Sequence, residues 1–377
     1  MFTIFNEAIM IVKDVFNLEL SKDEDTTPSK QRSVYHRPSV ADALAVKEIL
    51  LAKLPMEMVD TIIDSAEYWP HTSVALEQGQ PENSSQNKTS ISIVAGTNEN
   101  CFLLRSYPLG YIPKVHDPSN ISFESKEYPN ITPRPGVTPD KTSSTLELTR
   151  KTLSQWTDES QTRGDFPCRR IVFTIKSHDQ GWGGSFGHRG TYQGSFTWFE
   201  VGKEKIICVK DKILEGKIID NGGDLINLQD LPQILLPKSV LEVPESSESV
   251  RPVCTTQTLS PTINSLTTES SYLEEAPRTE QSFFHPLLPD QNILQKNLTA
   301  IGSTKEHVVV WSYDDDINPK SEAAIELEEN GRGCNTGNGS YVRSMRPGDI
   351  VTVWGKSRFS QWVNYVEGLN IDVYWAV

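Results

Sequence analysis

The chain lacks the features of a secreted or membrane-spanning protein. Its 377 residues include five cysteines, and no two of them are spaced as a CxxC pair. An odd number of scattered cysteines indicates reduced thiols rather than a disulfide framework. No apolar run reaches the roughly 18 residues that a membrane-spanning helix needs. The N-terminal apolar run has no basic segment before it and no cleavage site after it, so we expect no signal peptide and a cytoplasmic protein.

Positive charge is also scarce. The sequence has 36 Lys and Arg residues against 50 Asp and Glu residues, which gives a net charge of −14 at pH 7. Affinity for nucleic acid comes from Lys and Arg side chains that neutralise phosphates. We therefore expect no nucleic-acid partner, and the missing apolar span predicts no membrane partner either.

Catalytic and metal-binding motifs are missing as well. The chain has no P-loop, no GxGxxG after a strand, no HExxH and no Cys/His set with metal spacing. Asp314, Asp315 and Asp316 lack the spacing of a calcium loop and are interpreted as a solvated acidic turn. The glycine-rich stretch Gly331–Gly339 is interpreted as a loop. We expect no enzyme, no cofactor and no metal.

The apolar fraction of 37% and the mean hydropathy of −0.41 are low for a chain with an ordinary charged fraction of 23%. This composition indicates a compact core separated by polar segments. The composition shifts along the chain predict an N-terminal arm (1–38), a helical hairpin (39–70), a loose arm with short strands (71–160), the first half of a β-sandwich (161–210), a largely disordered insertion (211–290) and the second half of the sandwich (291–377).

Two helices are predicted near the N-terminus. Ser39 and Asp42 form a capping box at the start of Val40–Lys53. Pro55 suits the first turn of a second helix, which ends at Pro70. An apolar stripe on this second helix contains Met58, Ile62 and Ile63, and these are the candidate residues for docking a protein partner. Whether the hairpin docks a partner or the chain's own sheets is open at this point.

The later segments alternate with the period of strands. Ile171, Phe173 and Ile175 alternate with more polar residues, a glycine-rich loop follows, and Thr191–Val201 alternates again, so we expect the two to form one antiparallel unit. Further strands are expected at Lys205–Val209, Val308–Trp311, Ile350–Trp354 and Ile371–Val377, with a helix at Ser321–Glu329. Many short strands separated by turns predict a mainly β protein, an antiparallel jelly-roll-like β-sandwich formed by two sequence halves.

Three motifs resemble those of a known family. They are SHDQGWGG at Ser177–Gly184, GTYQGSFTWFE at Gly190–Glu200, and IDVYWA at Ile371–Ala376. They resemble the paired motifs of an uncharacterised fungal protein family. The resemblance implies a cytoplasmic protein with no assigned activity, and its pattern is similar to galactose-binding-like jelly rolls. Members of the family have a proline–glycine pair where this chain has Ser360-Gln361. Separately, Leu54–Asp60 resembles the opening of an F-box, without the third helix of that motif.

The candidate ligand-binding residues lie in two groups. The first group joins two predicted strands and offers an imidazole, a carboxylate, an amide and an aromatic face, a combination suited to sugars. The second group follows the Ile350–Trp354 strand. The first comprises His178, Asp179, Gln180 and Trp182, and the second comprises Arg358, Trp362 and Asn364.

Each group has an alternative structural role. Asp179 and Gln180 can cap loop amides while Trp182 fills the end of the sandwich. Arg358 can stack on Trp362 or pair with Asp179. The preferred hypothesis is a non-enzymatic binding or scaffold protein that takes a glycan or a protein through sandwich loops. The alternative is an F-box-like adaptor that docks a protein through the helical hairpin.

Overall fold

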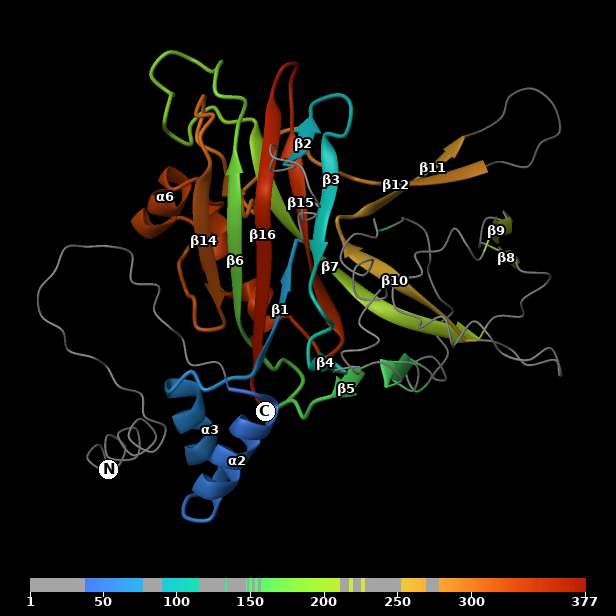
Figure 1. Cartoon of the computed structure of the whole chain (residues 1–377), viewed down its shortest axis with the longest axis vertical. Coiled ribbons are helices and arrows are strands. Elements are labelled where there is room, and N and C mark those ends of the chain that lie inside the picture. Colours follow the sequence, from blue (N-terminus) through green and yellow to red (C-terminus); the bar gives the residue numbers. More distant parts are fainter. Residues whose placement is uncertain are drawn as a thin grey trace, which may run out of the picture.

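The computed structural model describes residues 38–76, 90–114, 157–210, 217–219, 225–227, 252–268 and 278–377, with isolated positions between 133 and 154. Two five-stranded antiparallel sheets form the centre of the structure (Figure 1). The first sheet has the order β1-β16-β6-β14, and β2 also pairs with β16. Its strands are β1 (His71–Ala75), β2 (Ile91–Val94), β6 (Cys168–His178), β14 (Lys305–Ser312) and β16 (Val363–Trp375).

The second sheet has the order β10-β7-β15-β3, and β13 also pairs with β7. Its strands are β3 (Asn100–Arg105), β7 (Thr197–Lys210), β10 (Pro252–Ser260), β13 (Gln295–Lys296) and β15 (Asp349–Ser357). Three two-stranded pairs accompany the sheets: β4 (Tyr111–Pro113) with β5 (Thr157–Glu159), β8 (Lys217–Ile219) with β9 (Leu225–Asn227), and β11 (Ile263–Thr268) with β12 (Arg278–Phe283).

Both sheets combine strands that are far apart in the sequence. In the first sheet, Phe173 of β6 lies opposite Val309 of β14 on one side and Ile371 of β16 on the other. In the second sheet, β7 pairs with β15 over nine residue pairs, from Asp349↔Lys205 to Ser357↔Thr197. One hydrophobic cluster contains buried residues of both sheets. The prediction that the segments 161–210 and 291–377 form common sheets is confirmed by these pairings.

The helical pair predicted near the N-terminus is present. Helix α2 (Val40–Leu51) begins at Ser39, whose side chain accepts from the Asp42 amide in a capping box. Helix α3 (Met56–Ser65) follows Pro55, and Figure 1 shows both helices beside Val377 at the end of the first sheet. Ile62 and Ile63 are each 1% exposed, and Ile63 belongs to the cluster shared with the sheets. The stripe of α3 therefore packs within its own chain, while Met58 is half-buried.

Ion pairs tie the polar side of the helical pair to the sheets. Asp60 of α3 lies 3.1 Å from Lys47 of α2 and 3.0 Å from Arg163. Asp64 contacts Arg163 and lies 3.2 Å from Arg169 at the start of β6. Lys47 also donates to the oxygen of Val377 over 2.8 Å. The pair is thus attached by both apolar and charged contacts.

The prediction that β6 and β7 form one antiparallel unit is wrong. The two strands lie in different sheets, and the loop between them crosses from one sheet to the other. β7 begins at Thr197 rather than Thr191 and runs without a break through the strand expected at Lys205–Val209. Alternation shows which side chains face a core, but it does not show which strand is the hydrogen-bonded neighbour.

Some predicted loose segments contain strands. β1 lies in the arm predicted at 71–160 and pairs with β16, for example Thr72↔Val373. Within the insertion predicted at 211–290, β10 pairs with β7, and β11 pairs with β12. These strands are rich in Ser, Thr and Gln, and they form because ladder hydrogen bonds come from the backbone rather than from apolar side chains. The arm 1–37 and most of 115–156 and 211–251 lie outside the described residues.

The helix predicted at Ser321–Glu329 is confirmed. Helix α6 (Glu322–Glu329) begins after Ser321, whose side chain accepts from the Ala324 amide. The stretch interpreted as a loop contains the 3₁₀ helix η3 (Cys334–Gly337) and leads to the single turn α7 (Ser340–Arg343).

Candidate functional site

Asp179 has a structural role at the end of β6. Its side chain is fully buried, and its carboxylate accepts from the Gly181 amide over 2.8 Å and from the Ala300 amide over 2.5 Å. Burial raises the pKa of Asp179, and the amides of Gly181 and Ala300 oppose that shift. Ala300 adopts a left-handed backbone conformation with φ 57°, which few residues other than glycine adopt. The carboxylate therefore holds two loops together at this end of the sheets.

Of the residues near Asp179, Gln180 and His178 make contacts within the protein, whereas Trp182 is exposed. Gln180 donates to Trp182 O over 2.6 Å and accepts from the Val363 amide over 3.2 Å. The imidazole of His178 stacks on Tyr365 with ring centroids 4.8 Å apart. Its Nδ1 lies 2.6 Å from the backbone oxygen of Asp179 rather than from the carboxylate. Trp182 does not fill the end of the sheets, because its side chain is 55% exposed.

Arg358 is buried in a set of carbonyl contacts. Its guanidinium donates to Glu99 O and Pro286 O over 2.8 Å each and lies over the Trp198 ring. These contacts replace the pairing with Asp179 and the stacking on Trp362 that were considered for it. Trp362 instead meets Phe196 edge-on, with ring centroids 5.2 Å apart.

Asn364 belongs to a buried polar network between the two sheets. Its Oδ1 accepts from Asn297 Nδ2 over 2.9 Å, and its own amide donates to Trp198 O. Asn297 also donates to Thr197 Oγ1 over 3.0 Å and accepts from Ser177 Oγ over 2.7 Å. Ser177 and Asn364 lie in the first sheet, and Thr197 lies in the second. The network thus joins the sheets, and none of the seven predicted ligand residues lines the pocket described below.

Charged side chains are buried on the outer face of the second sheet, away from the shared core. Arg105 and Glu204 form a fully buried ion pair with an Nε–Oε2 distance of 2.6 Å. Lys356 is also fully buried, 3.3 Å from Glu200 Oε2. Burial lowers the pKa of Lys356 to about 8, although Glu200 favours its charged form. These charges are paired, as buried charges need to be.

A segment after β12 covers part of this face. Lys356 Nζ lies 2.5 Å from His285 Nδ1, and Pro286 accepts from Arg358. Burial, together with the positive charges of Lys356 and Arg358, lowers the pKa of His285 to about 3. His285 is therefore neutral at neutral pH and accepts from the ammonium. The same segment continues into the wall of a pocket.

The pocket has a volume of about 730 Å³ and lies between β7 and the segments around α7. This volume is within the range of about 300–1,000 Å³ that is typical of ligand sites. Apolar and aromatic side chains cover much of the wall. They are Val201, Leu259, Pro261, Phe284, Pro286, Trp311, Tyr341 and Val342. The Trp311 and Tyr341 rings meet edge-on, with centroids 5.2 Å apart.

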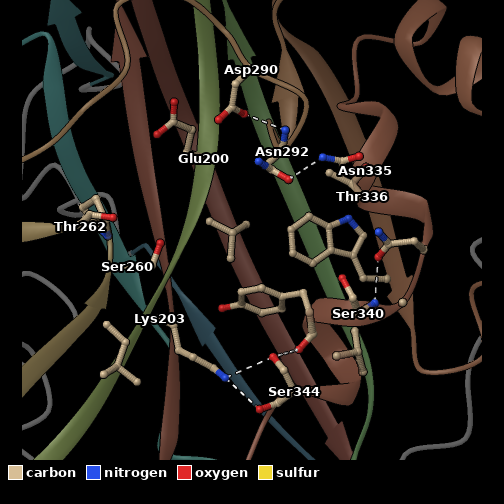
Figure 2. A pocket seen from close by; sticks show the side chains of 18 of the residues that line it. Glu200, Lys203, Ser260, Thr262, Asp290, Asn292, Asn335, Thr336, Ser340 and Ser344 are labelled. Carbon is tan, nitrogen blue, oxygen red and sulfur yellow. Dashed lines mark hydrogen bonds between the residues drawn. The ribbon is translucent and has the colours of Figure 1, made fainter. Parts of the chain in front are cut away.

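Polar side chains line the rest of the pocket. Figure 2 shows Asp290, Asn292, Asn335 and Thr336 along one side and Lys203 and Ser344 along the other. Asn335 Nδ2 donates to Asn292 Oδ1 over 3.2 Å, and Asp290 Oδ1 accepts from the Asn292 amide over 2.7 Å. Such a combination of an apolar floor and a few polar groups orients a ligand.

Backbone contacts hold the polar side of the pocket in place. The amides of Asn335 and Gly333 donate to Gln291 O and Ile293 O over 3.0 and 2.9 Å. Gly339, which precedes α7, has φ 66°, and a Cβ there would lie 2.6 Å from Asp315 O. The chain can make this close approach only with glycine. Hydrogen bonds and a turn that requires glycine therefore fix the backbone on this side of the pocket.

The charges at the pocket are nearly all paired within the protein. Lys203 Nζ lies 3.1 Å from Asp349 Oδ2 and donates to Ser344 O over 2.9 Å. Glu200 accepts from Trp198 Nε1 over 2.8 Å and pairs with Lys356. Asp290 is exposed, and no basic side chain is paired with it among the described residues.

Comparison with protein-family models, curated proteins and solved structures finds no match. Neither a family nor a relative therefore assigns a ligand to this pocket. No described helix has the length and apolar content needed to cross a membrane. In the described part of the chain, no group of three or more His, Cys, Asp or Glu side chains is placed to hold a metal ion.

The sequence analysis did not find the pocket. Trp311 was expected in a strand, and Asn335 lies in the stretch that was interpreted as a plain loop. Their counterparts Ser260 and Asp290 lie in the segment that was expected to be an insertion. The run of small and amide residues from Gly331 to Ser340 is a weak signal of a ligand site. It does not predict a pocket on its own, because the segments that form the opposite wall cannot be identified from the sequence.

Proposed function

We propose that this chain is a non-enzymatic binding protein, a jelly-roll-like β-sandwich of the cytoplasm that holds a glycan or a protein segment among its loops. The 730 Å³ pocket carries this proposal. Its walls come from loops and strand ends on both sides of the region 211–251. The buried positions of Cys168 and Cys334, both free thiols, support a reducing compartment.

The pairing of its charges supports binding rather than catalysis. A general acid or base needs a titratable group that is free to reach the ligand. Glu200 and Lys203, two of the charged groups that line the pocket, are engaged by Lys356 and Asp349. Apart from the exposed Asp290 carboxylate, the pocket offers an apolar floor, amides and hydroxyls, which bind without transferring protons.

A blocked pocket tests the proposal. Ser340 is exposed at the pocket wall, so Ser340→Trp places a large side chain there without disturbing a buried contact. Wild type and variant are screened by thermal shift against a glycan library and a peptide library. A ligand at about 100 times its Kd stabilises the wild type by roughly 2.7 kcal/mol. We expect that shift in the wild type and its loss in Ser340→Trp. Equal shifts in both proteins would place the ligand elsewhere, and no shift with either library would refute the proposal.

The exposed loop after β6 is a second candidate for a protein partner. Trp182 is 55% exposed and Phe186 is fully exposed, on a loop with several glycines. Exposed aromatic side chains are frequent anchors of protein interfaces. Trp182→Ala is expected to leave the melting temperature unchanged. It is expected to lower the affinity for a protein partner only if this loop is the docking site. The apolar stripe of α3 gives no comparable support to the adaptor hypothesis, because Ile62 and Ile63 are buried.

A further inference from the structure

The polar side of the pocket presents free hydrogen-bonding groups as a pair. The contact between Asn292 and Asn335 uses one N–H of Asn335 and the Oδ1 of Asn292. Within the described residues, Asn292 Nδ2 and Asn335 Oδ1 make no hydrogen bond. A donor and an acceptor therefore lie next to each other on two segments that backbone hydrogen bonds hold together. Two adjacent hydroxyls of a sugar ring each donate and accept, so they match such a pair.

The charges at the pocket disfavour an anionic ligand. Three charged side chains line it: Glu200, Asp290 and Lys203. Their formal charges give a net charge of −1, and Lys203 is already paired with Asp349. A carboxylate, sulfate or phosphate would bind without a free cation among these side chains and with the exposed Asp290 carboxylate in the pocket wall. An anion bound in these surroundings would lose hydration without gaining an ion pair.

The apolar floor disfavours a purely hydrophilic ligand such as a small ion. Trp311 and Tyr341 line the pocket along with Val201 and Val342. Sugars differ from other strongly hydrated molecules because one face of the ring carries C–H groups that pack on apolar and aromatic surface. The floor and the amide pair together thus fit the two faces of one sugar ring.

We propose that the pocket binds a neutral carbohydrate, with adjacent hydroxyls on the Asn292–Asn335 pair and the C–H face of the ring on the apolar floor. This inference rests on the proposed binding function and narrows its ligand to one chemical class. A peptide also carries donors and acceptors, but its amides are spaced along an extended backbone, and strand addition, one of its binding modes, needs a free sheet edge. The amide pair beside an apolar floor favours a sugar.

The test uses isothermal titration calorimetry with the full chain and three matched sets of probes: neutral oligosaccharides, the same oligosaccharides with a uronic acid, and short uncharged peptides. We expect neutral oligosaccharides to bind and the uronic acid forms to bind more weakly. Asn292→Ala is expected to weaken the neutral ligand roughly tenfold, because one hydrogen bond is worth about 1 kcal/mol and its partner amide is left unpaired. Asn370→Ala is the matched control, since Asn370 bonds Ser73 on the first sheet outside the pocket.

A charge variant tests whether the negative charge at the pocket causes the weaker binding of the uronic acid form. Asp290→Asn is expected to raise affinity for the uronic acid form roughly threefold while leaving the neutral form unchanged, as a nearby solvated charge is removed. Asp158→Asn, an exposed carboxylate on β5, is the control and is expected to change neither. Tighter binding of the uronic acid form by the wild type would overturn the preference for a neutral sugar, and tighter binding of peptides would overturn the carbohydrate class. Both outcomes would leave the pocket standing. Binding that survives Ser340→Trp would overturn both the carbohydrate class and the pocket.

Discussion

Replacing Asn297 by leucine tests whether the buried amide network joins the two sheets. Asn297 is 1% exposed and makes three side-chain hydrogen bonds, to Ser177, Thr197 and Asn364. Leucine has a similar size but neither donates nor accepts. The substitution therefore removes the three bonds and leaves a small change in volume.

The expected cost follows from the partners that remain. Each hydrogen bond contributes about 0.5–1.5 kcal/mol, and a buried acceptor left without a donor costs about 1–3 kcal/mol. Ser177 and Thr197 carry hydroxyls that can rotate to other acceptors, whereas Asn364 Oδ1 loses its donor and is fully buried. We expect Asn297→Leu to lower the free energy of unfolding by about 3–4 kcal/mol. For a folded part of this size, the melting temperature falls by roughly 6–15 °C.

Urea unfolding followed by tryptophan fluorescence measures this loss. Asn370→Leu is the control, because Asn370 makes one surface hydrogen bond to Ser73 and its loss is expected to cost less than about 0.5 kcal/mol. A cost below about 1 kcal/mol for Asn297→Leu would show that the network does not stabilise the contact between the sheets. A large loss in both variants would show that the effect is not specific to the buried position.

Two further predictions follow from His285 and Gln361. In the folded protein the pKa of His285 is lowered to about 3. Between pH 6.5 and 3 the unfolded chain therefore binds a proton at this residue that the folded protein does not bind. The free energy of unfolding consequently falls as the pH is lowered through this range, and His285 has no such effect above pH 6.5. His285→Gln is therefore expected to reduce the loss of stability between pH 6.5 and 4, by less than about 1.4 kcal/mol per pH unit, and identical pH profiles from urea midpoints would contradict this. Gln361 is exposed with φ 75°, so Gln361→Gly relieves left-handed strain and is expected to add about 0.5–1 kcal/mol to the free energy of unfolding. A lower melting temperature in scanning calorimetry would contradict that expectation.

Local sequence patterns predicted the positions of helices and strands better than they predicted which strands pair. The capping box at Ser39, the N-cap at Ser321 and the alternation around Phe173 each depend on residues a few positions apart, and all three are present. The pairing of β6 with β14 and β16 depends on contacts more than 100 residues apart. Periodicity contains no information on that choice, which is why β6 and β7 were expected to pair and instead lie in different sheets.

The candidate site shows the same limit. The sequence shows that Asp179 is polar and follows a strand. It does not show that two backbone amides of the loops donate hydrogen bonds to its carboxylate. Arg358 was expected near Asp179, and backbone carbonyls bind it instead. The pocket was missed because Trp311, Asn292 and Leu259 come from three segments with no common pattern. Trp182 alone among the predicted residues of the first group remains largely exposed.

The central claim is that strands on either side of the region 211–251 form the same two sheets and that segments from both sides line the pocket. A protease site inserted between Lys238 and Ser239 allows this to be tested in the intact protein. After cleavage, the two fragments are expected to elute together from a native sizing column, because β6 and β7 pair with β14, β15 and β16. They are expected to separate only in denaturant. Separation in native buffer into two independently folded fragments would contradict the shared sheets and the pocket between them.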